Sequence, residues 1–108
     1  MNLNPFLGEA IHGQKYEIGQ FYKQHVDYYN EDQMDTYCKW MGQRTWTTML
    51  YLNDVEEGGE TNFPKLDVAI KPKCGRILLF PANWQYRHSG LPPVSSQKYI
   101  VGSYLHYT

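Results

Sequence analysis

Turn-forming residues recur along this whole sequence and leave only short segments between them. The 108 residues include 9 Gly and 6 Pro, and pairs such as Asn53-Asp54 and Gly58-Gly59 add further turn signals. The intervening segments are rich in Tyr, Thr, Ile, Val and Leu, which are residues that favour strands. Short strands separated by frequent turns are typical of an all-β sandwich or barrel.

Eight segments are predicted to form strands. Segment 44–52 is dominated by Thr and aromatic residues, and in segment 98–107 period-2 alternation places Lys98 and Ile100 on one face. The apolar run 77–80, closed by a proline, is predicted to be a central strand buried on both faces. The remaining candidates are 15–18, 21–25, 60–61, 68–71 and 86–89.

Eight strands is the number that a jelly roll uses. Helical patterning is weak and confined to 30–40. We therefore predict an all-β fold, a double-stranded β-helix (jelly roll, cupin-like) with little or no helical support. The length of 108 residues fits a single domain spanning 1–108.

Composition excludes several classes of protein. Hydrophobic residues make up 42% and charged residues 19%, which is typical of a globular chain and not of a disordered one. The net charge of -1 gives no basic field for nucleic acid or an anionic membrane. No apolar run approaches the roughly 20 residues that span a bilayer. The first residues lack the features of a signal peptide, so we expect a cytoplasmic protein.

Aromatic residues make up 16% of the chain, and ten of them are Tyr. Tyrosine suits strands around a polar pocket and also suits interfaces, so a homo-oligomer is one expectation. The two cysteines, Cys38 and Cys74, lack the spacing of a zinc site. We interpret both as free thiols, with a single disulfide as the alternative.

His25-Val26-Asp27 and His88 form a candidate metal site. On a strand, residues i and i+2 point to the same face, so His25 and Asp27 would project side by side. Two histidines and one carboxylate are the facial triad of non-haem Fe(II) oxygenases, which leaves coordination positions open. The alternative is a histidine–aspartate pair on the surface with no ligand role.

Lys98 is predicted to open the last strand. A lysine buried in a barrel wall is costly unless an anion neutralises it. A dicarboxylate such as 2-oxoglutarate could bind iron at one end and pair with Lys98 at the other. The alternative is an exposed lysine at the edge of a strand.

Four blocks of the sequence lie in order over about 14–108. The blocks are Tyr16-x-x-Gly19-x-x-Tyr22-x-x-His25-x-Asp27, the strand from Arg44 to Leu52 with Gly58-Gly59-Glu60-Thr61, the run 71–80, and His88-Ser-Gly-Leu-Pro-Pro-Val followed by Lys98. Together they resemble the prolyl 4-hydroxylase family of Fe(II)/2-oxoglutarate dioxygenases, with one departure at Tyr104, where the family often has Trp.

The resemblance implies a role for eight residues. The Fe(II) ligands would be His25, Asp27 and His88. The residues of the 2-oxoglutarate pocket would be Lys98, which pairs with the distal carboxylate, Tyr16, which hydrogen-bonds the same carboxylate, and Tyr51. The catalytic residues on the substrate side of the iron would be Arg44 and Tyr22.

The implied activity is hydroxylation of a substrate C–H bond. The reaction would require Fe(II), consume 2-oxoglutarate and O2, and release succinate and CO2. The expected substrate is a prolyl residue in a peptide or protein, and ascorbate would support turnover. Asp27 favours hydroxylation, since halogenating relatives lack this carboxylate. About 24 residues precede His25, so the chain resembles a minimal version of the family or a piece of a larger protein.

Three alternatives stay open. One is a non-catalytic cupin-like barrel that binds metal and 2-oxoglutarate. Another is a hydroxylase of a free amino acid or other small molecule. The last is a β-sandwich interaction module whose histidines and aspartate are incidental.

Overall fold

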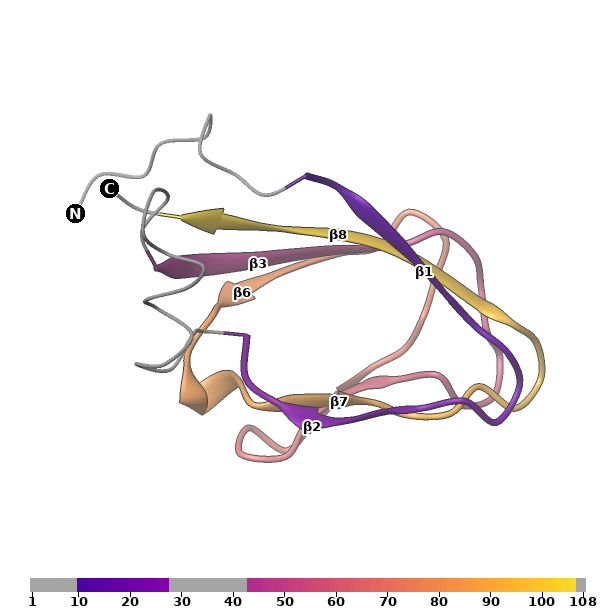
Figure 1. Ribbon diagram of the computed structural model, residues 1–108. Coiled ribbons are helices and arrows are strands. Elements are labelled where there is room, and N and C mark those ends of the chain that lie inside the picture. Colours follow the sequence, from indigo (N-terminus) through magenta and orange to yellow (C-terminus); the bar gives the residue numbers. More distant parts are fainter. Residues whose placement is uncertain (1–9, 28–42, 107–108) are drawn as a thin grey trace.

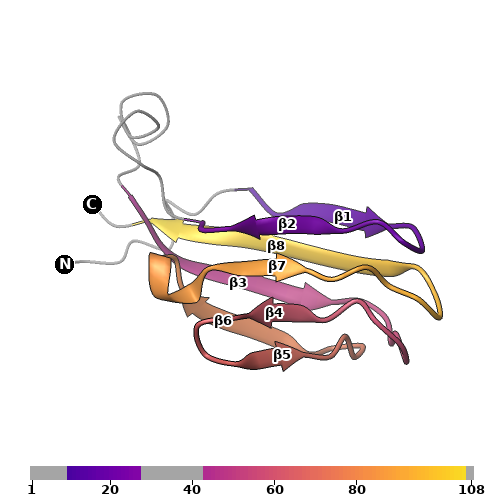
Figure 2. The ribbon, with the colours of Figure 1, turned by 90° about the horizontal axis from the view of Figure 1, so that it is seen from below.

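The computed structural model describes residues 10–27 and 43–106. Within them, eight antiparallel strands form two four-stranded sheets that face each other, as Figures 1 and 2 show. The major sheet has the order β1 (His12–Tyr16), β8 (Lys98–His106), β3 (Arg44–Tyr51), β6 (Ile77–Pro81). The minor sheet has the order β2 (Tyr22–His25), β7 (His88–Gly90), β4 (Thr61–Phe63), β5 (Val68–Ile70). The predicted jelly roll is confirmed.

The prediction that 77–80 is a central strand buried on both faces is wrong. β6 is an end strand of the major sheet and pairs with β3. Its side chains alternate, because Leu78 and Phe80 are buried whereas Ile77 and Leu79 are 67% and 62% exposed. An unbroken apolar run indicates a strand but does not show whether one or both faces are covered. Pro81, which cannot donate a ladder hydrogen bond, is itself compatible with an edge strand.

Strand ends also differ from the predictions, most clearly before His88. Segment 86–89 was expected to be a strand, but Tyr86 belongs to a short 3₁₀ helix, Trp84–Tyr86, and β7 begins at His88. The side chain of Asn83 accepts a hydrogen bond from the Gln85 amide at 3.0 Å and starts this turn. The weak helical pattern at 30–40 lies outside the described residues.

The core between the sheets is largely aromatic. Tyr51 is fully buried, and Phe63 from the minor sheet meets Phe80 from the major sheet edge to face at 5.0 Å. Both phenyl rings also contact the imidazole of His88, with centroid distances of 5.4 and 5.0 Å. The candidate metal ligand His88 is therefore held directly by core packing.

Pairing between strands places the other candidate residues. His25 on β2 lies opposite His88 on β7, and Tyr16 on β1 lies opposite Lys98 on β8. Because directly paired residues of antiparallel strands point to the same face, each pair projects between the sheets. Among the described residues, the structure contains no helix that is long and apolar enough to cross a membrane.

Candidate active site

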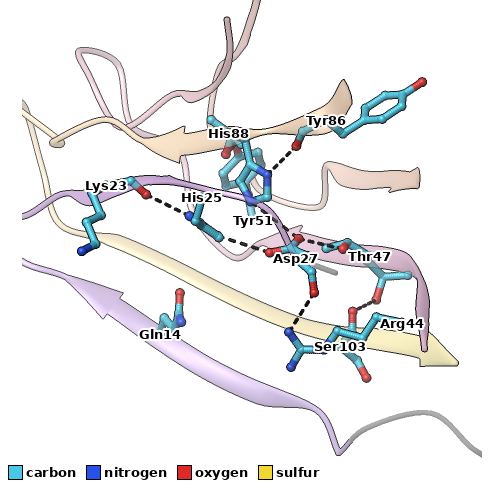
Figure 3. A network of polar contacts seen from close by, with 12 residues as sticks. Gln14, Lys23, His25, Asp27, Arg44, Thr47, Tyr51, Tyr86, His88 and Ser103 are labelled. Atoms are coloured by element: carbon cyan, nitrogen blue, oxygen red, sulfur yellow. Dashed lines mark hydrogen bonds and ion pairs between the residues drawn. The ribbon is translucent and has the colours of Figure 1, made fainter. Parts of the chain in front are cut away.

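The side chains of His25, Asp27 and His88 converge between the two sheets (Figure 3). One ligand atom from each of the three lies within 4.8 Å of the others. The Nε2 atom of His25 is 3.2 Å from Oδ1 of Asp27, and the Nε2 atom of His88 is 3.6 Å from Oδ2. Asp27 is 4% exposed and His88 7%, so the alternative of a solvated surface pair does not fit.

The backbone fixes the tautomers of both histidines. The Nδ1–H of His25 donates to the carbonyl oxygen of Lys23, and the Nδ1–H of His88 donates to that of Tyr86, each at 2.9 Å. A carbonyl oxygen can only accept, so Nδ1 must carry the proton in both rings. When a ring is neutral, its lone pair is therefore on Nε2, the atom that faces Asp27. This arrangement is typical of metal-binding histidines.

The electrostatics of the site favour an ionised carboxylate. Burial raises the pKa of Asp27, but at the acid pH where a carboxyl titrates both imidazoles are protonated, and the hydrogen bond with His25, the charge of His88 and the hydrogen bond from Thr47 outweigh burial and hold this pKa below its usual value. Burial lowers the pKa of His88, so its ring stays neutral near pH 7. Burial also lowers the pKa of His25, yet the Asp27 carboxylate overcomes this effect and raises it.

Two neutral imidazoles and one carboxylate fit Fe(II) in a facial arrangement that leaves positions for other ligands. Tetrahedral structural zinc is a poorer match, since it takes four protein ligands, frequently including cysteine. The three side chains can therefore hold a divalent ion and leave part of its coordination sphere open.

A cavity extends from these residues toward Lys98. It holds about 630 Å³ of space, its open mouth included, and both sheets line it. Lys98 is 1% exposed, and its Nζ atom donates to the carbonyl oxygen of Gly59 at 3.0 Å and lies 4.1 Å from the ring centroid of Tyr16. Burial lowers the pKa of Lys98 to about 8. The alternative of an exposed edge lysine does not fit.

Tyr16 and Gly90 complete the region around the Lys98 ammonium. Burial raises the pKa of Tyr16 to about 12, so its phenol stays protonated and can donate a hydrogen bond. Its hydroxyl donates to Oε1 of Gln14 at 3.2 Å. A Cβ atom at Gly90 would lie 3.5 Å from the Tyr16 hydroxyl and 3.6 Å from Nζ of Lys98, so the missing side chain leaves space at this point.

Tyr51, which the resemblance places at the 2-oxoglutarate pocket, lies behind the cavity and does not line it. Its hydroxyl hydrogen-bonds the side chain of Thr61 and donates to the carbonyl oxygen of Ile70 at 3.2 Å. Thr61 does line the cavity. Tyr51 therefore contacts the cavity wall from the core side.

Of the two residues expected on the substrate side of the iron, Tyr22 lines the cavity beside His25, and Arg44 does not line it but contacts Asp27 and Tyr104, which do. Tyr22 is 44% exposed, and its ring centroid is 4.3 Å from that of His25. Arg44 donates from Nη1 to the backbone carbonyl of Asp27 at 3.1 Å, and its guanidinium lies 3.7 Å from the centroid of the Tyr104 ring. Arg44 is thus tied to the chain segment that carries the candidate metal ligand Asp27.

Sequence reasoning missed several residues that line the cavity, among them Thr47, Gly90 and His12. Thr47 is one of the three threonines within residues 45–48, and nothing in the sequence shows which of them hydrogen-bonds Asp27. His12 stacks on Tyr104 with the ring centroids 5.9 Å apart, a contact that depends on the pairing of β1 with β8. Of the two cysteines, Cys74 is a free and exposed thiol, and Cys38 lies outside the described residues.

Comparison with known proteins agrees with this geometry. A family model described as the 2OG-Fe(II) oxygenase superfamily matches residues 11–106. A probable prolyl 4-hydroxylase 3 from Arabidopsis thaliana is 34% identical over 128 aligned residues, which cover 92% of this chain and 42% of the relative. A probable prolyl 4-hydroxylase 10 from the same plant is 41% identical over 93 residues, with 68% of this chain and 31% of the relative covered.

A solved structure gives the same result for the fold. The viral collagen prolyl hydroxylase of Paramecium bursaria Chlorella virus-1, solved as a 2OG complex, superposes with a TM-score of 0.81 at 31% identity. The match covers 99% of this chain and 62% of the viral protein, so the chain spans less than two thirds of each of these three relatives. With a family model matched over 11–106, the chain belongs to the 2OG-Fe(II) oxygenase superfamily and resembles its prolyl 4-hydroxylases.

Proposed function

We propose that residues 1–108 form a single Fe(II)- and 2-oxoglutarate-dependent oxygenase domain that hydroxylates a prolyl residue in a peptide or protein. The observation that carries this proposal is the presence, in one cavity, of the buried triad His25, Asp27, His88 and the buried cation of Lys98. A ligand that chelates metal at one end and carries an anion at the other matches both.

Each residue then has a defined task. His25, Asp27 and His88 hold Fe(II), which supplies the coupled oxidation of 2-oxoglutarate and substrate by O2 to give succinate, CO2 and the alcohol. Lys98 binds the distal carboxylate of 2-oxoglutarate by a charge-assisted hydrogen bond, and the protonated Tyr16 phenol donates to the same group. Burial of these groups keeps water from competing for the anion.

The names of the relatives support a prolyl substrate. Tyr22, Tyr104 and His12 line the cavity with aromatic rings, and aromatic rings suit contact with the apolar pyrrolidine ring of proline. Ascorbate is proposed as a supporting reductant. Self-association is proposed as well, because Ile77 and Leu79 give the major sheet exposed apolar side chains that a contact would bury.

The direct test measures succinate and hydroxylated product from purified protein with Fe(II), 2-oxoglutarate, ascorbate and a proline-containing peptide in air. We expect succinate and hydroxyproline in equal amounts, and neither product from the same peptide with alanine for proline. Hydroxylation of free proline alone would instead establish the small-molecule alternative. Binding of metal and 2-oxoglutarate with no turnover on any substrate would establish the non-catalytic barrel.

Gly90→Ala is expected to weaken 2-oxoglutarate binding without disturbing the fold. The new methyl group would meet its neighbours at ordinary contact distances of 3.4–3.6 Å, but it would fill space beside the Lys98 ammonium. We expect the apparent KM for 2-oxoglutarate to rise roughly 10-fold, the scale of one methylene group in a fitted pocket. Gly13→Ala on β1 is the matched control, because a Cβ there meets other atoms at 3.8 Å. An unchanged KM in Gly90→Ala would place the distal carboxylate elsewhere.

A further inference from the structure

Thr47 contacts the metal-ligand aspartate from the opposite sheet. Its Oγ1 donates to Oδ2 of Asp27 at 2.7 Å (Figure 3). Thr47 is 6% exposed and Asp27 4%, so water does not compete for this bond. The hydrogen bond joins β3 of the major sheet to the segment that follows β2 of the minor sheet. The proposed roles of the other site residues do not involve this hydrogen bond.

A second bond from the same strand holds the backbone of the aspartate. Arg44, three residues before Thr47, donates from Nη1 to the Asp27 carbonyl oxygen at 3.1 Å. The face of the Tyr104 ring supports the Arg44 guanidinium at 3.7 Å. β3 therefore fixes both the main chain of Asp27, through Arg44, and its carboxylate, through Thr47.

The Thr47 bond makes the two carboxylate oxygens unequal. A carboxylate with no partner turns about its χ2 angle and can present either oxygen or both. Each oxygen faces one histidine, since Oδ1 lies 3.2 Å from Nε2 of His25 and Oδ2 lies 3.6 Å from Nε2 of His88, but only Oδ2 also accepts the hydrogen bond from Thr47. Hydrogen bonds to a ligating carboxylate orient it, and their loss typically costs about 10–100-fold in metal affinity.

We propose that Thr47 is a positioning residue for the metal site, whose hydroxyl orients Asp27 so that Oδ1 faces the ion. This inference rests on the proposed function and deepens it. It assigns Thr47 a role in metal affinity that differs from a general contribution to folding.

Four variants separate the two roles. Thr47→Val keeps the shape of the side chain and removes the hydroxyl, and Thr47→Ser keeps the hydroxyl. Thr48→Val is the matched control, because the neighbouring Thr48 hydroxyl donates to the Ser103 carbonyl at 3.1 Å and does not touch Asp27. Thr47→Ala removes the hydroxyl without placing a methyl group against the carboxylate, and it is the second variant should Thr47→Val not fold.

The readout is the Mn(II) dissociation constant, measured by calorimetry without co-substrate or turnover. We expect Thr47→Val and Thr47→Ala to bind Mn(II) roughly 10–100-fold more weakly than the wild type. Thr47→Ser and Thr48→Val should stay within about 3-fold of it, less than that typical loss. Wild-type affinity in Thr47→Val, or a loss in Thr47→Ser as large as in Thr47→Val, would overturn the inference. Failure of the wild type itself to bind Mn(II) would overturn the proposed function as well.

Discussion

Replacing His88 with alanine is expected to abolish metal-dependent stabilisation and succinate formation together. The substitution removes one of the three atoms that converge within 4.8 Å and leaves His25 and Asp27 as the remaining protein ligands. The loss should exceed the roughly 10–100-fold typical of a residue that only supports a ligand. Thermal unfolding with and without Mn(II) measures the metal effect, since an ion that binds the folded state raises its stability.

His88 also packs against Phe63 and Phe80, so truncation removes core contacts as well as a ligand. His88→Phe separates these effects, because a phenyl ring fills the space but cannot bind metal. We expect this variant to fold with no response to Mn(II). His12→Ala is the control for loss of a cavity-lining histidine outside the triad, and it should retain the metal response. A His88→Phe protein that Mn(II) stabilises as it does the wild type would refute the triad.

Lys98→Met is expected to raise the stability of the ligand-free protein while nearly eliminating 2-oxoglutarate binding. Lys98 is 1% exposed, and its ammonium group donates a hydrogen bond to a neutral group, the backbone carbonyl of Gly59. An apolar side chain of similar length removes the cost of burying this charge, and we expect a gain of about 2 kcal/mol near pH 7. Loss of a charge-assisted hydrogen bond should weaken 2-oxoglutarate binding by roughly 10–100-fold.

The pH dependence of stability gives an independent check on Lys98. Its pKa is about 8 in the folded protein and 10.5 in the unfolded chain, so between these two pH values only the unfolded chain holds the proton. The contribution of Lys98 to stability therefore rises with pH from about 8 to 10.5, and it is constant well below pH 8. Lys98→Met should lose this rise.

Lys73→Met is the matched control, because Lys73 is exposed and lies outside the cavity. It should leave both the pH profile of unfolding and 2-oxoglutarate binding unchanged. Denaturant unfolding between pH 7 and 11 measures the first effect, and calorimetry measures the second. A Lys98→Met protein that is less stable than the wild type at pH 7 would mean that the contacts of Lys98 with Gly59 and Tyr16 outweigh the cost of burying its charge.

The sequence predicted those parts of the site that depend on local spacing. The alternation after Lys98 places Ile100 on the buried side, and the aromatic and β-branched segments predicted the strands themselves. These features follow from period-2 geometry, which is a property of the chain over a few residues. His25 and Asp27 do lie side by side, with 3.2 Å between Nε2 and Oδ1, although β2 ends at His25 and Asp27 lies in a bend beyond it.

Contacts between distant strands were beyond such reasoning. The bond from Thr47 to Asp27 depends on how the two sheets face each other, and the exposure of Ile77 and Leu79 depends on which strand ends the sheet. Tyr51 shows the same limit, since its hydroxyl meets Thr61 behind the cavity wall. Residue type and spacing do not encode sheet order, so these positions required the tertiary structure.

The measurement that tests the central claim most directly is calorimetric binding of 2-oxoglutarate and of glutarate, each with and without Mn(II) under nitrogen. Both compounds carry the distal carboxylate that Lys98 would bind, but glutarate lacks the 2-oxo group that chelates metal. If the triad and Lys98 bind the same ligand, Mn(II) should lower the dissociation constant of 2-oxoglutarate by at least about 10-fold and leave that of glutarate almost unchanged. By linkage, 2-oxoglutarate should lower the dissociation constant of Mn(II) by the same factor. Equal affinity for 2-oxoglutarate with and without Mn(II), or no binding of 2-oxoglutarate at all, would contradict the account.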